Sequence, residues 1–239
     1  MSEHLVVVKG GGDLASGVVY RLKRAGYPVI VTELAAPLLV RRAVAFGEAV
    51  YAGQVEIDGI TARRVDSTEA AREMAPTEVV PVLFDPAAAA VRALRPAVVV
   101  DGIMAKMNTG TRIDDAPLVV ALGPGFTAGV DCHAVVETMR GHSLGRLLYR
   151  GTAAPDTGTP GTVAGHTADR VLRAPAAGHV DAVVAIGERV APGDLIATVA
   201  GTTIRAPFAG VLRGIVHPAV EVTSGMKIGD LDPRGVVEH

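Results

Sequence analysis

Residues 5–33 decide the fold of the first part of the chain and read LVVVKGGGDLASGVVYRLKRAGYPVIVTE. The apolar run at residues 5–8 is short enough for a buried strand, and apolar residues at helical spacing follow three consecutive glycines. A second apolar run, residues 28–32, leads to Glu33. The order of strand, glycine turn, helix and strand predicts the first repeat of a mainly parallel sheet.

Within this stretch, Gly10-x-Gly12-x-x-Ala15 fits the G-x-G-x-x-G/A fingerprint of Rossmann-type dinucleotide-binding units. Its glycines allow a tight turn and a close approach of the backbone to a pyrophosphate, which the N–H groups at the helix start would face. Glu33 follows Gly12 by about 20 residues, where an acid accepts from a ribose hydroxyl. Cofactor binding is therefore predicted at Gly10, Gly11, Gly12, Asp13 and Glu33. The alternative is a tight strand–helix turn with no ligand and a solvated Glu33.

The composition limits the class of protein. The 239 residues suffice for one large domain or two small ones. A net charge of −2 without a basic block argues against a nucleic-acid binder. The sequence has no apolar run near the ~18–20 residues that span a bilayer and begins without signal-peptide features, so we expect a cytoplasmic protein without membrane contacts. A single cysteine, Cys132, excludes an intrachain disulfide.

Strand-like and helix-like segments alternate through residues 1–165, which predicts a Rossmann-like, mainly parallel sheet. A hairpin is expected around Asp58-Gly59, because this dipeptide between alternating apolar residues is a strong hairpin signal. The other expected elements are a helix over residues 36–46 and strands over residues 49–52, 79–84, 97–100, 118–122 and 131–138.

Ligands of such sheets bind beyond the carboxyl ends of the strands. One predicted strand ends at Asp101, and the loop after it holds Lys106, a point charge for a phosphate, and Asn108. The next strand ends at a second glycine-rich loop with Gly123 and Gly125, whose N–H groups can approach an anion. We predict that these five residues bind the cofactor. A solvated lysine and a tight turn without a ligand are the alternatives.

Polar residues with a period of two follow the second glycine-rich loop. If residues 131–138 form a strand, Asp131, His133 and Glu137 share one face. With Lys106, they are the candidates for acid–base catalysis. Asp131 and His133 alone do not make a metal site, and we predict none. The alternative is a hydrogen-bonded polar face that orders the loop.

The last part of the chain, residues 166–239, contains a duplication. RAPAAG, which begins at Arg173, recurs as RAPFAG from Arg205, an offset of 32 (205 − 173) that relates further pairs. Two interlocked copies, each of three strands, resemble the barrel-sandwich hybrid of biotinyl and lipoyl domains. Those carriers hold their modified lysine on a hairpin that corresponds to residues 197–203, which contain no lysine. We therefore expect an all-β, biotinyl/lipoyl-like domain without biotin or lipoate attachment, appended to the α/β domain.

The order of motifs along nearly the whole chain resembles the YqeB family. The motifs are KGGGDLASG, DGIMAKMNTG, GPGFTAGVDCHAVVETMRGHSLGR, PDTGTPG, APFAGVLRG and KIGDLDPRG. The family is described as accessory proteins of selenium-dependent molybdenum hydroxylase systems, and the first domain is also similar to XdhC-type molybdenum-cofactor chaperones. This resemblance implies maturation or insertion of a selenium-modified molybdenum cofactor into a partner hydroxylase. It assigns no catalytic role, but it carries over the motif positions Gly10, Gly12, Asp13, Lys106, Asn108, Gly123, Gly125, Asp131, His133, Glu137, Arg140 and His142.

The sequence leaves three functions open. The preferred one is a maturation protein that binds a nucleotide or the molybdenum-cofactor phosphate at the turn Gly10–Gly12. The second is an NAD(P)-dependent oxidoreductase with Lys106 or His133 as proton donor, on the premise that both loops flank one edge of the sheet. The third is a non-catalytic interaction protein whose glycine turns bind nothing. A homodimer is also expected.

Overall fold

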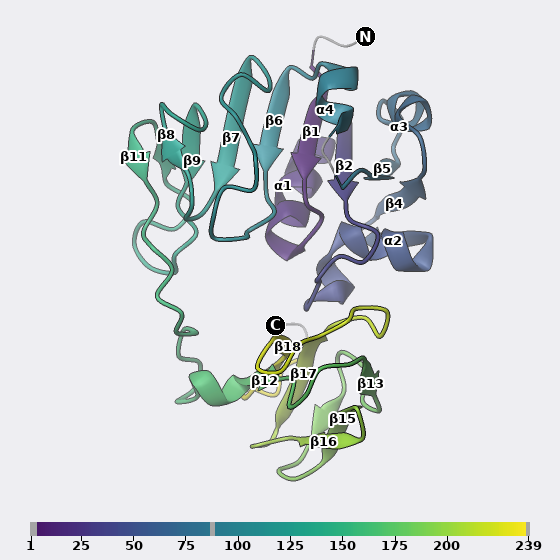
Figure 1. Ribbon diagram of the computed structural model, residues 1–239, viewed down its shortest axis with the longest axis vertical. Coiled ribbons are helices and arrows are strands. Elements are labelled where there is room, and N and C mark those ends of the chain that lie inside the picture. Colours follow the sequence, from purple (N-terminus) through teal and green to yellow (C-terminus); the bar gives the residue numbers. More distant parts are fainter. Residues whose placement is uncertain (1–3, 87–88, 238–239) are drawn as a thin grey trace. The chain divides into compact units, whose positions relative to one another are not determined.

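A computed structural model describes residues 4–86 and 89–237. The chain divides into two compact units (Figure 1). The first unit contains the chain up to Pro37 together with Val44–Asp156, and the second contains Leu38–Ala43 together with the chain from Thr157 onward. The fold is α/β, with one large, mostly parallel sheet and smaller antiparallel sheets.

The first unit contains a nine-stranded sheet in the order β10-β9-β7-β6-β1-β2-β5-β4-β3. All neighbouring strands from β4 to β9 are parallel, and the outermost strands, β3 and β10, are antiparallel to their neighbours. The strands are β1 (Val6–Lys9), β2 (Val29–Glu33), β3 (Gln54–Ile57), β4 (Ile60–Val65), β5 (Val80–Phe84), β6 (Val98–Asp101), β7 (Leu118–Leu122), β9 (Ala134–Val136) and β10 (Leu147–Leu148). A separate pair joins β8 (Thr127–Ala128) to β11 (Gly151–Thr152).

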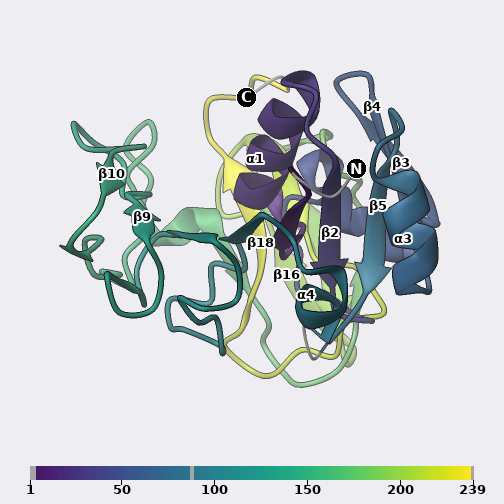
Figure 2. The ribbon, with the colours of Figure 1, turned by 90° about the horizontal axis from the view of Figure 1, so that it is seen from above.

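Both faces of this sheet are buried, which explains the continuous apolar runs of its central strands. Val6 and Val8 of β1 belong to one core, and Leu5 and Val7 belong to the core on the opposite face. Helices α1 and α2 supply side chains to the first core, and α3 and α4 supply the second. Figure 2 shows α1 and α4 on opposite sides of β2. The helices are α1 (Asp13–Arg24), α2 (Ala49–Ala52), α3 (Thr68–Met74) and α4 (Ala89–Leu94).

Local signals in the sequence predicted some elements correctly and others wrongly. The hairpin β3–β4 is confirmed, and Asp58 and Gly59 turn it with φ values of 49° and 77°. The strand predicted over residues 49–52 is wrong, because these residues form α2. The predicted strand over residues 131–138 is much shorter, since β9 spans only Ala134–Val136.

The helix predicted over residues 36–46 is also wrong. Two short 3-10 turns, η1 (Arg42–Val44) and η2 (Phe46–Glu48), are the only helical turns in this part of the described chain. Within the second unit, the Nε of Arg42 donates to the carbonyl oxygen of Ile215 over 2.8 Å. The segment is therefore fixed by partners far along the chain, which its own periodicity does not reveal.

Two antiparallel sheets make up the second unit, with the orders β12-β18-β17-β14 and β13-β15-β16. A short 3-10 turn, η3 (Ala168–Arg170), precedes the first strand. The hairpin that was predicted to correspond to the carrier site of lipoyl domains joins β15 to β16, and Ala200 and Gly201 turn it with positive φ. The strands are β12 (Val171–Arg173), β13 (Val180–Ala182), β14 (Arg189–Val190), β15 (Leu195–Val199), β16 (Thr202–Arg205), β17 (Gly210–Ile215) and β18 (Lys227–Asp232).

Strand pairing confirms that the two copies of the duplication interlock. Strand β12 of the first copy pairs with β18 of the second, and β16 of the second copy pairs with β15 of the first. The bridge between Val190 and Gly210 has a counterpart between Gly178 and Val222, with both residues displaced by the offset of 32 and the roles of the copies exchanged. The biotinyl/lipoyl-like classification itself stays a prediction. Throughout the described residues, the helices are too short or too polar to cross a membrane.

Candidate functional site

The strand order of the first unit reverses at β1. The chain passes from β1 to β2 on one side and later returns to β6 on the other side, so the carboxyl ends of β1 and β6 border the crevice where open α/β sheets bind ligands. Lys9 ends β1 and Asp101 ends β6, and the two residues are neighbours in the sheet register. Next to them, a Cβ added to Gly102 would lie 2.7 Å from the Cβ of Ala15, so the third fingerprint position packs tightly.

A buried polar cluster joins these two strand ends. The ammonium of Lys9 donates to the hydroxyl of Thr111 and lies 3.6 Å from Oδ2 of Asp101. The Thr111 hydroxyl in turn donates to the same carboxylate oxygen over 2.5 Å. All three side chains are buried. The cluster balances one positive with one negative charge, which lowers the cost of burying both.

Sequence reasoning missed Lys9. The signal that could have found it is a lysine directly after the apolar run of a central strand, where both faces of the sheet are buried. Such a lysine needs a carboxylate partner, and Asp101 at the end of another predicted strand was one of the candidates.

The first glycine turn touches neighbouring backbone on two sides. Gly10 has φ +84°, and a Cβ added to it would lie 2.9 Å from the Cα of Ile103. A Cβ added to Gly11 would lie 2.6 Å from the backbone nitrogen of Gly47. These distances are too short for any side chain, so the backbone contacts of this turn themselves require glycine.

The N–H groups of this turn are only partly available to a ligand. Gly10 donates to the carbonyl of Thr32 over 2.9 Å, and Gly11 donates to Oε1 of Glu33 over 2.6 Å. This differs from the expectation that both amides face an anion, because the protein supplies its own acceptors. Gly12 is the N-cap of α1, and no side chain among the described residues caps it; Asp13 follows in the first turn. An anion would therefore meet the start of α1.

Glu33 lies at the end of β2 with 9% of its surface exposed, so the alternative of a solvated side chain is wrong. Its carboxylate accepts from the backbone of Gly11 and, over 2.9 Å, from that of Leu34. Burial raises the pKa of Glu33, and the two backbone hydrogen bonds oppose this rise. A carboxylate offers about four lone-pair sites, so it retains capacity to accept from a ribose hydroxyl.

The loop after β6 supports the buried cluster through Asn108. Lys106 of the same loop pairs with Asp156, which is not a member of the cluster. Asn108 accepts from the backbone N–H of Thr111 and donates to its carbonyl, both over 2.8 Å, which fixes the turn that presents this threonine to Asp101. The ammonium of Lys106 lies 2.7 Å from Oδ2 of Asp156, and these side chains are 56% and 39% exposed. Lys106 has φ 64°, a strained backbone conformation of the kind that clusters at functional loops.

The second glycine-rich loop packs against the loop after β6. A Cβ added to Gly125 would lie 2.6 Å from both the N and the Cα of Met107, and one added to Gly123 would lie 2.6 Å from Oγ1 of Thr138. Both glycines have positive φ. Their observed role agrees with the alternative of tight turns, and anion binding there stays a prediction.

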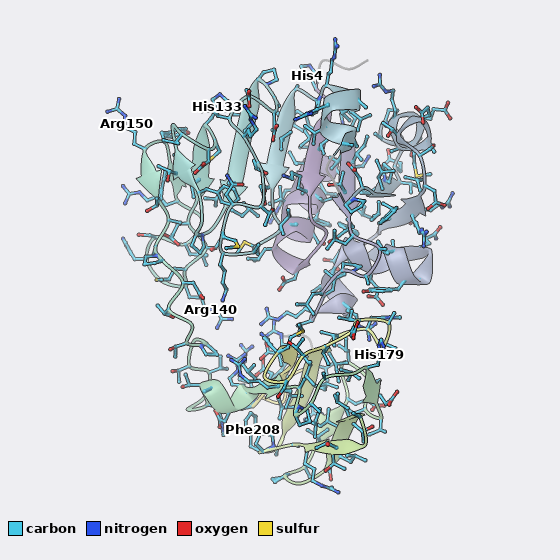
Figure 3. The ribbon with its side chains drawn as sticks, viewed as in Figure 1. His4, His133, Arg140, Arg150, His179 and Phe208 are labelled. Atoms are coloured by element: carbon cyan, nitrogen blue, oxygen red, sulfur yellow. The ribbon has the colours of Figure 1, made fainter. Side chains whose placement is uncertain are left out.

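His133 lies away from the glycine turn. Its backbone N–H donates to the carbonyl of Val119 over 2.8 Å, and its Nδ1 accepts from the N–H of the same residue over 3.0 Å. Val119 is in the amino-terminal half of β7, and Figure 3 shows His133 at the opposite end of the first unit from Arg140. The premise that Lys106 and His133 flank one edge of the sheet is therefore wrong.

Asp131 and Glu137 order loops through backbone amides. Asp131 accepts from the N–H of Thr127 over 2.7 Å. Glu137 accepts from Met139 over 2.7 Å and from Ala154 over 2.8 Å. These hydrogen bonds, chiefly that from Ala154, lower the pKa of Glu137. The arrangement matches the alternative of a hydrogen-bonded polar segment, and nowhere in residues 4–86 and 89–237 do three metal-ligating side chains gather.

Comparison with known proteins shows one extensive match. The chain is 49% identical over 231 residues, 97% of its length, to "Uncharacterized protein YqeB" of Escherichia coli (strain K12). The match supports the YqeB family. The chain spans 43% of the length of that relative.

Two further comparisons bear on neither the fold nor the function of this chain. No protein-family model matches the chain. A crystal structure of an aspartoacylase family protein from Mesorhizobium loti aligns with 97% of this chain and 85% of its own at 14% identity. Its TM-score of 0.28 is too low to bear on fold or function.

The remaining positions of the YqeB motifs divide between core and surface. Cys132 is fully buried, and burial, followed by the nearby charge of Asp131, raises the pKa of its thiol to about 11. Cys132 therefore acts as a small buried hydrophobe, since little thiolate forms at neutral pH. Arg140 and His142 are exposed.

Proposed function

We propose that this chain is a maturation protein that binds a nucleotide-bearing cofactor beside the start of α1 and serves a selenium-dependent molybdenum hydroxylase. The binding part rests on one observation: the buried acid at the end of β2, Glu33, is hydrogen-bonded onto the glycine turn at the end of β1. The hydroxylase part rests on the motifs shared with the YqeB family, with support from the identity to the Escherichia coli relative.

The charges around the turn favour a nucleotide over a free phosphate. The carboxylate of Glu33 lies at the turn, where it would repel a bare dianion. A nucleotide can donate a ribose hydroxyl to Glu33 and place its phosphate at the start of α1, which carries a partial charge of about +0.5. The described residues fit such a ligand on these two points. The nicotinamide or molybdenum chemistry would belong to the cofactor itself.

Native mass spectrometry of the freshly purified protein tests the binding part. We expect a retained mass that identifies either NAD(P) or a pyranopterin nucleotide. Glu33→Gln should lose most of that mass, because it removes the negative charge of the acceptor and replaces one of its two oxygens with a donating NH2 group. Glu56→Gln is the matched control, since it lies exposed on the edge strand β3, and it should retain the ligand. A ligand-free wild type that also fails to bind added nucleotides at millimolar concentration would end the proposal.

A genetic experiment tests the hydroxylase part separately. Hydroxylase activity should collapse in a strain that lacks this protein, return with the wild-type gene, and stay low with Glu33→Gln. Normal activity without the protein would refute the maturation role, while the nucleotide measurement would still stand on its own. Restored activity with Glu33→Gln would instead separate maturation from the proposed nucleotide site.

A further inference from the structure

A cavity in the first unit lies at the edge of the sheet opposite to the crevice. Its volume is about 810 Å³, which is within the range of small-molecule sites. One wall comes from residues 91–97, at the end of α4, and the other from residues 112–117, which lead into β7. Strands β6 and β7 begin here and run parallel to β1, so their carboxyl ends lie at the other edge (Figure 1). The cavity is therefore separate from the candidate nucleotide site.

The walls of this cavity are partly apolar. Val91 and Pro96 are buried, and Ala97 and Ala116 are half-buried. Sites for small molecules are typically lined by such groups, with a few polar groups that fix the orientation of the ligand. The cavity thus offers a surface that can cover the apolar body of a ligand.

The charged side chains of the lining leave one positive charge in excess. They are Arg92, Arg95, Arg112, Asp114 and Asp115, which gives 3 − 2 = 1. Arg112 binds Asp114 through two hydrogen bonds, from Nε to Oδ1 over 3.0 Å and from Nη2 to Oδ2 over 3.3 Å. Asp115 accepts from the backbone N–H of Arg112 over 3.0 Å. Both carboxylates therefore have partners within their own loop.

The two arginines of the other wall have no acceptor. Arg92 and Arg95 are exposed, and neither side chain makes a hydrogen bond or an ion pair with any of the described residues. They are three residues apart at the end of α4, and residues at this spacing are neighbours on a helix surface. Each guanidinium is a planar fork of N–H donors that matches the two oxygens of a carboxylate.

The backbone of Arg95 is strained. This residue directly follows Leu94, the last residue of α4, and has a left-handed conformation with φ 47°. Helices very commonly end with a residue in this conformation, which is usually glycine because glycine adopts it without strain. The helix end would thus fold more readily with glycine. An arginine kept there, beside a cavity, indicates a role for its side chain.

We propose that this cavity binds a small organic carboxylate. Arg92 and Arg95 hold the carboxylate group, and the apolar walls cover the rest of the molecule. One negative charge matches the excess of one, whereas a phosphate dianion exceeds it and is repelled by Asp115. The proposal goes beyond the nucleotide site and does not depend on it.

Isothermal titration of the full-length protein with benzoate tests this proposal. Benzoate combines one carboxylate with an apolar ring, and we expect saturable binding at millimolar concentrations. Benzamide has nearly the same shape without the charge, so it should not bind measurably. Inorganic phosphate should bind more weakly than benzoate, because it lacks an apolar body and carries the higher charge.

The variant Arg95→Gly separates ligand binding from folding. It removes the guanidinium but relieves the strained backbone, so the midpoint of thermal unfolding should rise while the affinity for benzoate falls at least about tenfold. Arg92→Gln, at an exposed position, should weaken binding to a similar degree. Arg24→Gln is the matched control, because Arg24 lies in the last turn of α1, on the opposite face of the sheet. This variant should bind benzoate like the wild type.

Four outcomes would overturn the proposal. The first is a wild type that does not bind benzoate, and the second is an Arg95→Gly variant that binds it with unchanged affinity. Equal weakening by Arg92→Gln and Arg24→Gln is the third, since it would reflect the charge of the whole protein rather than this cavity. Binding of a glutamate-rich peptide without binding of benzoate is the fourth, because it would assign the arginines to a protein partner.

Discussion

The two units bury aspartates beside their sheets in different ways. In the first unit, Asp101 meets one lysine, Lys9, and one threonine hydroxyl, so the cluster is neutral. In the second unit, Asp230 and Asp232 each bind two arginines. A lysine ammonium is a point charge, whereas the planar guanidinium of arginine forms directed hydrogen bonds with a carboxylate. The first unit therefore balances its buried aspartate with a single ammonium, and the second holds its aspartates in networks of directed arginine hydrogen bonds.

The largest expected effect breaks the neutral cluster. Asp101→Asn leaves the ammonium of Lys9 buried without a counter-charge, which should reduce the free energy of unfolding by about 3–5 kcal/mol. Denaturant unfolding monitored by circular dichroism measures this loss. The control is Asp114→Asn, which removes a carboxylate from the exposed pair with Arg112 and should change the free energy of unfolding by about 0–1 kcal/mol. Similar small losses in both variants would contradict a balanced, buried pair.

The next effect tests how tightly the glycine turn beside this cluster is packed. Gly11→Ala places a Cβ against the backbone of Gly47 and should destabilise the protein by about 1–3 kcal/mol. Gly17→Ala is the matched control, because Gly17 lies in the interior of α1 with open space where the Cβ would be. That variant should gain about 0.5–1 kcal/mol. Thermal melts compare them, and a tolerated Gly11→Ala would mean that the turn is open enough for another occupant.

The sequence predicted what depends on local pattern. The parallel sheet, the glycine turn, the hairpin at Asp58-Gly59 and the interlocked duplication all follow from periodicity or short motifs. The polar clusters depend on partners far apart in the chain: Lys9 and Thr111 are 102 residues apart, and Arg41 and Asp230 are 189 residues apart. Pairing over such distances leaves no periodic signal in one sequence. The same cause made the helix predicted over residues 36–46 wrong.

A third prediction uses the opposite pKa shifts of one acid in each unit. Burial raises the pKa of Glu33 in the folded state, so its contribution to stability is present at low pH and is lost as pH rises through the raised value. The Arg234 guanidinium, above all, holds the pKa of Asp232 well below its usual range. Its contribution is therefore present above the unfolded pKa of about 4 and is lost as pH falls toward the lowered value.

Unfolding of the wild type, Glu33→Gln and Asp232→Asn across pH measures these contributions. The stability of Glu33→Gln relative to the wild type should increase as pH rises above about 4. The deficit of Asp232→Asn should be full at neutral pH and should shrink as pH falls below about 4. Parallel pH profiles for the two variants would show that the units do not differ in this electrostatic respect.

The smallest effect on stability is expected for substitution of Lys106. This substitution tests whether Lys106 only forms a surface ion pair or also contacts the ligand. Lys106→Met removes the exposed pair with Asp156 and should change the free energy of unfolding by no more than about 1 kcal/mol. If this lysine also contacts the cofactor as predicted, nucleotide affinity should fall while stability stays nearly constant. Lys106→Arg keeps the charge and should retain most of that affinity. Unchanged affinity in both variants, measured by calorimetric titration, would leave Lys106 with the surface pair alone and restrict the site to the start of α1 and Glu33.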